Sequence, residues 1–157
     1  MQLETWPSPT FVFGPMSGEP NDGAPNGMRQ GADGSLNPKV LIVEDEGLVA
    51  MNIESALAEA GFRVLAVVDT EAEAIDAALR LKPDVILMDI TLREGNGISA
   101  AQAIQRQLNV HIVFVSGNSD PATLAAARQT RSSGFIRKPF LTDRLASLVR
   151  EAITAKN

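Results

Sequence analysis

The chain has 157 residues, a formal net charge of −5 and an isoelectric point near 4.9, and 45% of its residues are hydrophobic. This acidic balance argues against a nucleic-acid binder, which needs a basic surface to contact phosphates. Because the chain has no cysteine, disulfides, thiolate metal sites and a cysteine nucleophile are excluded. No apolar run approaches the roughly 20 residues of a membrane span, and no secretory signal begins the chain. We therefore expect a cytoplasmic protein without membrane insertion.

Residues 1–37 differ in composition from the rest of the chain. They hold five of the 9 prolines and six of the 12 glycines, and they show neither helical nor alternating periodicity. Such a composition buries too little apolar surface to offset the entropy of ordering. We predict a disordered or extended tail over residues 1–37 and a folded domain over residues 38–157.

The folded part begins with the continuous apolar run KVLIVE (39–44), which predicts a buried strand. LVAMNIESALAEAG (48–61) then places apolar residues at helical spacing and ends in a glycine, as a helix does. FRVLAVV (62–68) is apolar and β-branched, which predicts the second strand. Thr70 and Glu73 form a Thr-x-x-Glu capping box, which predicts the start of the second helix.

Three more strands are predicted, and a helical pattern follows each of them. The third strand is DVILMD (84–89), the fourth is VHIVFVS (110–116) and the fifth is the short GFIRK (134–138). After the fourth strand, Asp120 and Pro121 match an N-cap residue followed by the first residue of a helix.

Five βα repeats with near-continuous apolar strands predict a parallel sheet covered by helices on both faces. Right-handed crossovers leave few topologies for a domain of about 120 residues. We predict an α/β fold, a (βα)5 doubly wound parallel sheet in the flavodoxin-like order 2-1-3-4-5. A ferredoxin-like α+β fold is the structural alternative, and the strict alternation of strands and helices counts against it.

Polar side chains end four of the five predicted strands. Glu44 and Asp45 follow the first apolar run, Asp89 ends the third, Ser116 ends the fourth and Lys138 ends the fifth. In a doubly wound sheet, ligands bind beyond the carboxyl ends of the strands, near the switch in strand order. We therefore expect three carboxylates, a hydroxyl and an ammonium to share one edge of the sheet.

These residue types suit the chemistry of phosphoryl transfer. Clustered carboxylates repel one another unless a cation or a proton joins them, and Mg²⁺ prefers hard oxygen ligands of this kind. A carboxylate oxygen of Asp89 could attack phosphorus in line and form an acyl phosphate. Lys138 and Ser116 would then stabilise the negative charge of the phosphoryl oxygens. Each residue alone also fits a turn, a helix start or a solvated loop, so the argument rests on their conjunction.

The chain from about Lys39 to Ile153 resembles the receiver domain of two-component response regulators. The matching pieces are LIVEDE, DVILMDITL, HIVFVSGN and GFIRKPF, in that order. The resemblance implies that Asp89 accepts a phosphoryl group from the phosphohistidine of a histidine kinase or of a histidine phosphotransfer protein. It implies a signalling phosphoacceptor that assists its own phosphotransfer and autodephosphorylation, and not an enzyme.

The resemblance also implies roles for the other residues of the site. It implies a Mg²⁺ site formed by Glu44, Asp45, Asp89 and the main-chain carbonyl of Thr91. It implies that Ser116 and Lys138 bind phosphoryl oxygens, and that Phe135 is the switch aromatic, which turns inward when the hydroxyl residue moves toward the phosphate. Thr91 and Asn118 stand where the family tunes dephosphorylation.

Two positions depart from the family pattern. Four residues after Asp89, where family members often have proline, this chain has Arg93, and we expect a less constrained loop there. The switch aromatic is often tyrosine in the family. Phe135 has no hydroxyl, so it offers a partner no hydrogen bond that depends on its rotamer.

The last predicted helix is followed almost at once by Asn157, and we expect no effector domain, a monomer or weak dimer, and signalling through a protein partner. The expected surface is the face of the fourth helix, fifth strand and fifth helix. Its arginines are Arg128, Arg131, Arg137 and Arg144. Two alternatives stay open. A phosphohydrolase with an Asp nucleophile would want a second Asp where this chain has Thr91, and a receiver-shaped scaffold that is never phosphorylated contradicts no residue.

Overall fold

The computed structural model describes residues 37–118 and 120–154, so the predicted tail, apart from Asn37, lies outside the described residues. Strands and helices alternate along the described chain. The strands are β1 (Lys39–Val43), β2 (Arg63–Val68), β3 (Val85–Asp89), β4 (His111–Ser116) and β5 (Gly134–Arg137). The helices are α1 (Gly47–Glu59), α2 (Glu71–Leu81), α3 (Gly97–Gln105), α4 (Pro121–Arg128) and α5 (Thr142–Thr154). None of the described helices combines the length and the apolar content that a membrane crossing requires.

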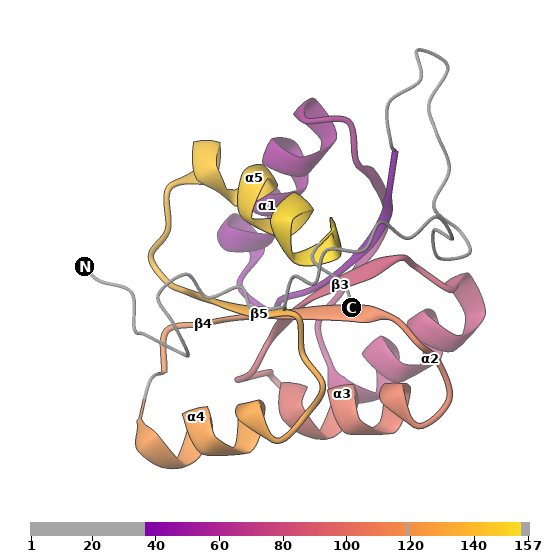
Figure 1. Ribbon diagram of the computed structural model, residues 1–157, viewed down its shortest axis with the longest axis vertical. Coiled ribbons are helices and arrows are strands. Elements are labelled where there is room, and N and C mark those ends of the chain that lie inside the picture. The colour runs from indigo at the N-terminus through magenta and orange to yellow at the C-terminus, as the bar shows by residue number, and fades with distance from the viewer. Residues whose placement is uncertain (1–36, 119, 155–157) are drawn as a thin grey trace.

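The sheet has five strands in the order β2-β1-β3-β4-β5, and every neighbouring pair is parallel. Helices α1 and α5 cover one face, and α2, α3 and α4 cover the other (Figure 1). The predicted doubly wound fold is therefore confirmed. The strand order reverses between β1 and β3, which places the carboxyl ends of these two strands side by side.

The sheet separates two apolar clusters, because successive side chains of a strand point to opposite faces. On the α1 and α5 face, Val113 and Val115 of β4 pack in one cluster with Leu57 of α1. On the other face, Phe114 of β4 packs in a second cluster with Ile104 of α3. Each such side chain contributes about 1.5–3 kcal/mol when it is fully buried, so both faces anchor the central strands.

Two helix starts form as the sequence predicts. The hydroxyl oxygen of Thr70 accepts a hydrogen bond from the main-chain N–H of Glu73, at 3.1 Å. The Glu73 carboxylate accepts from the N–H of Asp69 at 3.4 Å, one residue before the cap. At α4, Asp120 Oδ1 accepts from the N–H of Thr123 at 2.8 Å. These bonds satisfy main-chain donors that a helix start would otherwise leave unpaired.

Candidate functional site

Three carboxylates meet at the carboxyl ends of β1 and β3. Glu44 directly follows β1, and Asp89 is the last residue of the neighbouring β3. Glu44, Asp45 and Asp89 each offer a carboxylate oxygen, and these oxygens all lie within 4.8 Å of one another. Glu44 is 3% exposed and Asp89 4% exposed, so this acidic cluster is largely withdrawn from water.

Lys138 extends its ammonium group to the acidic cluster from the end of the edge strand β5. It follows β5 directly, and its N–H donates to the carbonyl of Ser116 at 3.0 Å. Its Nζ lies 3.0 Å from Asp89 Oδ2 and 3.0 Å from Glu44 Oε1. Two strands, β3 and β4, lie between β5 and β1. The long side chain of Lys138 spans them to reach Glu44.

Burial and the neighbouring groups shift the pKa values of Glu44 and Lys138. Burial raises the pKa of Glu44 to about 7, and the Asp89 charge adds to this, while the hydrogen bond from Lys138 opposes it. Burial lowers the pKa of Lys138, but hydrogen bonds to Asp89 and Glu44 outweigh it and raise the pKa to about 12. The ammonium is therefore always charged near neutral pH, and it balances only part of the negative charge.

The acidic cluster fits a hard divalent cation. Oε1 of Glu44 is buried and lies 3.0 Å from Nζ of Lys138, but it accepts no hydrogen bond from a residue in the ranges 37–118 and 120–154. Because one ammonium is shared by the buried carboxylates of Glu44 and Asp89, a divalent cation would offset the negative charge that Lys138 leaves unbalanced. Carboxylate oxygens are the ligands that Mg²⁺ takes in proteins. The donor set therefore suits Mg²⁺, as the sequence leads us to expect.

Main-chain donors and a hydroxyl complete the site. The N–H of Thr91 donates to Asp89 Oδ1 at 3.1 Å, so each oxygen of that carboxylate has a partner. Ser116 ends β4 and is 1% exposed. Its Oγ accepts a hydrogen bond from the N–H of Asn118 at 3.0 Å, which leaves the hydroxyl proton available to donate.

The loop after Asp89 returns tightly on itself before α3 begins. The N–H of Gly97 donates to the carbonyl of Ile90 at 2.8 Å, and Thr91 and Asn96 form an antiparallel bridge. A Cβ atom at Gly97 would lie 2.1 Å from the carbonyl oxygen of Asp89. Only glycine lets the main chain at position 97 come this close to the carbonyl of Asp89. The start of α3 therefore packs directly against the main chain of Asp89.

The family model for the response regulator receiver domain matches residues 40–150. The chain belongs to this family. The receiver domain described here is 31% identical over 117 residues to the chemotaxis protein CheY of Thermotoga maritima, a match that covers 74% of this chain and 98% of CheY. It is 29% identical to the transcriptional regulatory protein PdtaR of Mycobacterium tuberculosis over 78% of this chain and 60% of PdtaR. The match thus spans less than two thirds of PdtaR.

Solved structures show the same similarity. The receiver domain of a sensor histidine kinase from Pseudomonas aeruginosa superposes with a TM-score of 0.68 and 29% identity, over 74% of this chain and 98% of that one. That structure has a magnesium ion coordinated in its active-site cleft. The receiver domain of a modulated diguanylate cyclase from Desulfovibrio desulfuricans superposes with a TM-score of 0.70 and 34% identity, over 74% of this chain and 94% of that one.

In this receiver domain, Phe135 lies inward. It is 3% exposed and belongs to the apolar cluster beneath α2, α3 and α4, and it is paired in register with Phe114. The family resemblance implies that the inward rotamer accompanies phosphorylation.

One of the four arginines expected on the α4, β5 and α5 face also contacts the end of α3. Arg131 donates from its guanidinium to the carbonyl of Gln105, at 3.1 Å, and from its N–H to the Gln105 side chain, at 3.3 Å. Gln105 is the last residue of α3. The carbonyl at the end of α3, which has no partner within the helix, thus accepts from the guanidinium of Arg131. This contact gives Gln105 a structural role.

Glu46 is a member of the site that the sequence reasoning missed. Its Oε1 lies 3.4 Å from Nζ of Lys138, although its side chain is 63% exposed. In the sequence VEDE, Glu46 is typical of an acidic residue at a helix start, and that pattern does not predict a contact with Lys138. The available signal was a second glutamate two residues after Glu44, on the same edge of the sheet.

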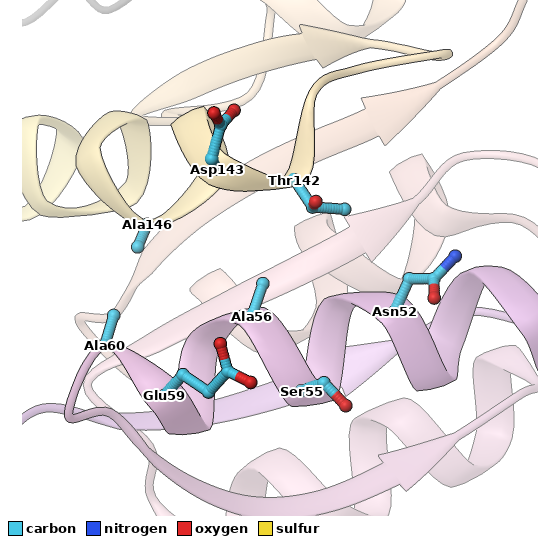
Figure 2. A pocket seen from close by; sticks show the side chains of 8 residues that line it. All are labelled: Asn52, Ser55, Ala56, Glu59, Ala60, Thr142, Asp143 and Ala146. Carbon is cyan, nitrogen blue, oxygen red and sulfur yellow. The ribbon is translucent and has the colours of Figure 1, made fainter.

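A pocket of about 400 Å³ opens between α1 and α5, and Figure 2 shows the side chains that surround it. It is lined by Asn52, Ser55, Ala56, Glu59, Ala60, Thr142, Asp143 and Ala146. None of the three clustered carboxylates lines it, so it is separate from the acidic cluster. Near its lining residues, Leu48, Met51 and Leu141 are exposed apolar side chains, and they give this edge of the receiver domain an apolar character.

Proposed function

We propose that this receiver domain accepts a phosphoryl group on Asp89 and passes the signal on by protein contact. The observation that carries the proposal is the distance of 3.0 Å between Lys138 Nζ and Asp89 Oδ2, beside three clustered carboxylates. The proposed Mg²⁺ ligands are Glu44, Asp45, Asp89 and the main-chain carbonyl of Thr91. When bound, Mg²⁺ would neutralise charge on the phosphoryl oxygens.

The chain's own residues would act as follows. The Asp89 carboxylate attacks phosphorus in line, and the bond from phosphorus to the imidazole nitrogen of the donor breaks, leaving its electron pair on that nitrogen. Lys138 exchanges its contact with Asp89 for one with a phosphoryl oxygen, and Ser116 donates its hydroxyl proton to another. Positive charge and fixed donors are what this reaction chiefly needs.

The proposed output depends on Ser116 and Phe135. Phosphorylation shifts a conformational equilibrium only as far as the two conformers bind the phosphoryl group differently. We assign this difference to Ser116 and to the position of Phe135, which lie on the neighbouring strands β4 and β5. Thr91 and Asn118 are exposed beside the site, where they would set the access of water to the acyl phosphate. The partner would read the face of α4, β5 and α5.

The edge next to the acidic cluster suits the donor protein. Leu48 is 75%, Met51 61% and Leu141 67% exposed. Leu48 and Met51 lie in the first turns of α1, directly after Glu46, and Leu141 directly precedes α5. Exposed apolar side chains beside a reactive group are typical of protein-binding surfaces. We therefore propose that a histidine kinase or a histidine phosphotransfer protein docks on this surface. We further propose that the transfer takes place in the cytoplasm and that the accepting chain is a monomer or weak dimer.

The double variant Leu48→Asp, Met51→Asp is expected to slow phosphotransfer from the phosphorylated histidine domain of a sensor kinase about tenfold, because apolar contact is replaced by charge. Phosphorylation by acetyl phosphate should not change, since this small donor needs no docking surface. Rates are measured with radiolabelled phosphate. Ala58→Asp, an exposed substitution farther along α1, is the control. Equal slowing with both donors would show damage to the site and would contradict the docking assignment.

Acetyl phosphate with Mg²⁺ should add about 80 Da, the mass of one PO₃ group, to the intact chain. Chelation of the metal should prevent the gain, because Lys138 alone balances too little of the negative charge. Intact-mass spectrometry measures the effect. The unphosphorylated scaffold predicts no gain with any donor, and a phosphohydrolase predicts release of phosphate from external esters without a stable adduct. Either result would exclude the proposal.

A further inference from the structure

The loop that follows β3 is fastened to the start of α2. Arg93 Nη2 lies 2.9 Å from Asp69 Oδ1. The N–H of Asn96 donates to Glu71 Oε1 at 3.0 Å, and the N–H of Glu71 donates to the carbonyl of Glu94 at 3.0 Å. We call these three contacts the loop clamp. They join residues 23 to 25 positions apart in the chain.

The loop clamp does not depend on its ion pair alone. The side chains of Arg93 and Asp69 are 54% and 40% exposed, and exposed pairs contribute little to stability. The hydrogen bond from Arg93 and its charge do lower the pKa of the Asp69 carboxyl. Glu71 also packs tightly against the loop at Gly95: a Cβ atom at Gly95 would lie only 2.3 Å from the Cβ of Glu71. Gly95 has a φ of +92°, a conformation that favours glycine.

The loop clamp reaches the acidic cluster through the antiparallel bridge of the loop. Asn96, which Glu71 holds, is bridged to Thr91. The N–H of Thr91 in turn donates to Oδ1 of Asp89. A shift of Asn96 is thereby transmitted to the main chain that borders Asp89 within a few atoms.

We infer that Glu71, assisted by Asp69 and Arg93, is a positioning residue that holds the loop so that the main chain of Thr91 is preset at the cation site. The inference rests on the proposed function, since it takes the acidic cluster to bind Mg²⁺. The sequence led us to expect a less constrained loop where Arg93 replaces proline. In the structure, contacts with the start of α2 hold this loop where a proline ring is lacking.

The test measures Mg²⁺ binding to the full chain by calorimetry, together with hydrogen exchange of the Asn96 amide. Glu71→Ala removes the acceptor for that amide and should weaken Mg²⁺ binding about threefold to tenfold, the equivalent of one hydrogen bond, with faster exchange. Glu71→Gln keeps a side-chain oxygen and should stay within about twofold of the unmodified chain. Asp76→Ala is the control, because it removes the same charge from α2 but from a side chain that pairs with Arg80 of the same helix.

The outcomes separate the two proposals. Mg²⁺ binding that is unchanged in Glu71→Ala, or equally weakened in Asp76→Ala, would overturn the inference and leave the proposed function standing. No Mg²⁺ binding by the unmodified chain would overturn both. If Glu71→Ala fails to fold, Arg93→Gln replaces it: its smaller loss should disappear at high salt, which screens exposed charges. A loss that persists at high salt would count against the loop clamp.

Discussion

Replacing Asp89 with Asn should abolish the gain of about 80 Da that acetyl phosphate and Mg²⁺ are expected to give the unmodified chain. The amide has nearly the shape of the carboxylate but lacks its negative charge and nucleophilicity. It also withdraws a ligand from the cation site and the ion pair with Lys138. Intact-mass spectrometry over a time course measures the effect, and the expected result is complete loss of the adduct.

Asp84→Asn is the matched control for this experiment. Asp84 is also buried, and it directly precedes β3, at the opposite end of that strand from Asp89. Its Oδ2 accepts a hydrogen bond from the N–H of Lys39, and an amide oxygen would preserve that contact. The control should gain the full mass. An Asp89→Asn protein that still gained it would show that phosphate is carried by another residue.

Gly97→Ala should destabilise the receiver domain by about 2–3 kcal/mol, the cost of forcing extra volume into a tightly packed position. The added methyl group would lie 2.1 Å from the carbonyl oxygen of Asp89 and 2.9 Å from Cα of Ile90. Both are main-chain atoms, so neither can move aside as a flexible side chain would. The free energy of unfolding is measured by urea denaturation, and Mg²⁺ binding should weaken in the protein that remains folded.

Gly47→Ala provides the opposite expectation. Gly47 begins α1, and a Cβ atom there would meet nothing within 4 Å. Alanine at this position should raise the free energy of unfolding by about 0.4–1 kcal/mol, because it restricts the unfolded chain and favours the helix. Equal stability losses at the two glycines would show that the contact with Asp89 is not the cause.

The sheet and the composition of the site could be predicted from the sequence for a physical reason. Buried parallel strands are continuous apolar runs, and each run here ends where a polar residue begins. The carboxyl ends of parallel strands share one edge, so the order of the strands also gathers Asp45, Asp89 and Lys138. The strand ends were less well predicted: β1 ends at Val43 and β5 at Arg137, one residue earlier than expected.

Contacts between loops and exposed side chains could not be predicted in this way. Glu46 and Lys138 are 92 residues apart, and Arg131 and Gln105 are 26 apart. Loops have no periodicity that fixes the direction of a side chain. The sequence around a charged loop residue therefore does not indicate whether that residue forms an ion pair or a hydrogen bond. The burial of Phe135 likewise depends on the cluster beneath α2, α3 and α4, which the sequence of β5 does not contain.

The two apolar clusters divide the domain into two halves that share no residue. Phe135 belongs to the half beneath α2, α3 and α4, whereas the packing of α1 and α5 belongs to the other. A rearrangement of this aromatic ring would therefore act first on the layer of α3 and α4. The proposed output face joins α4 of one half to α5 of the other, so a change at Phe135 would have to cross the sheet to reach α5.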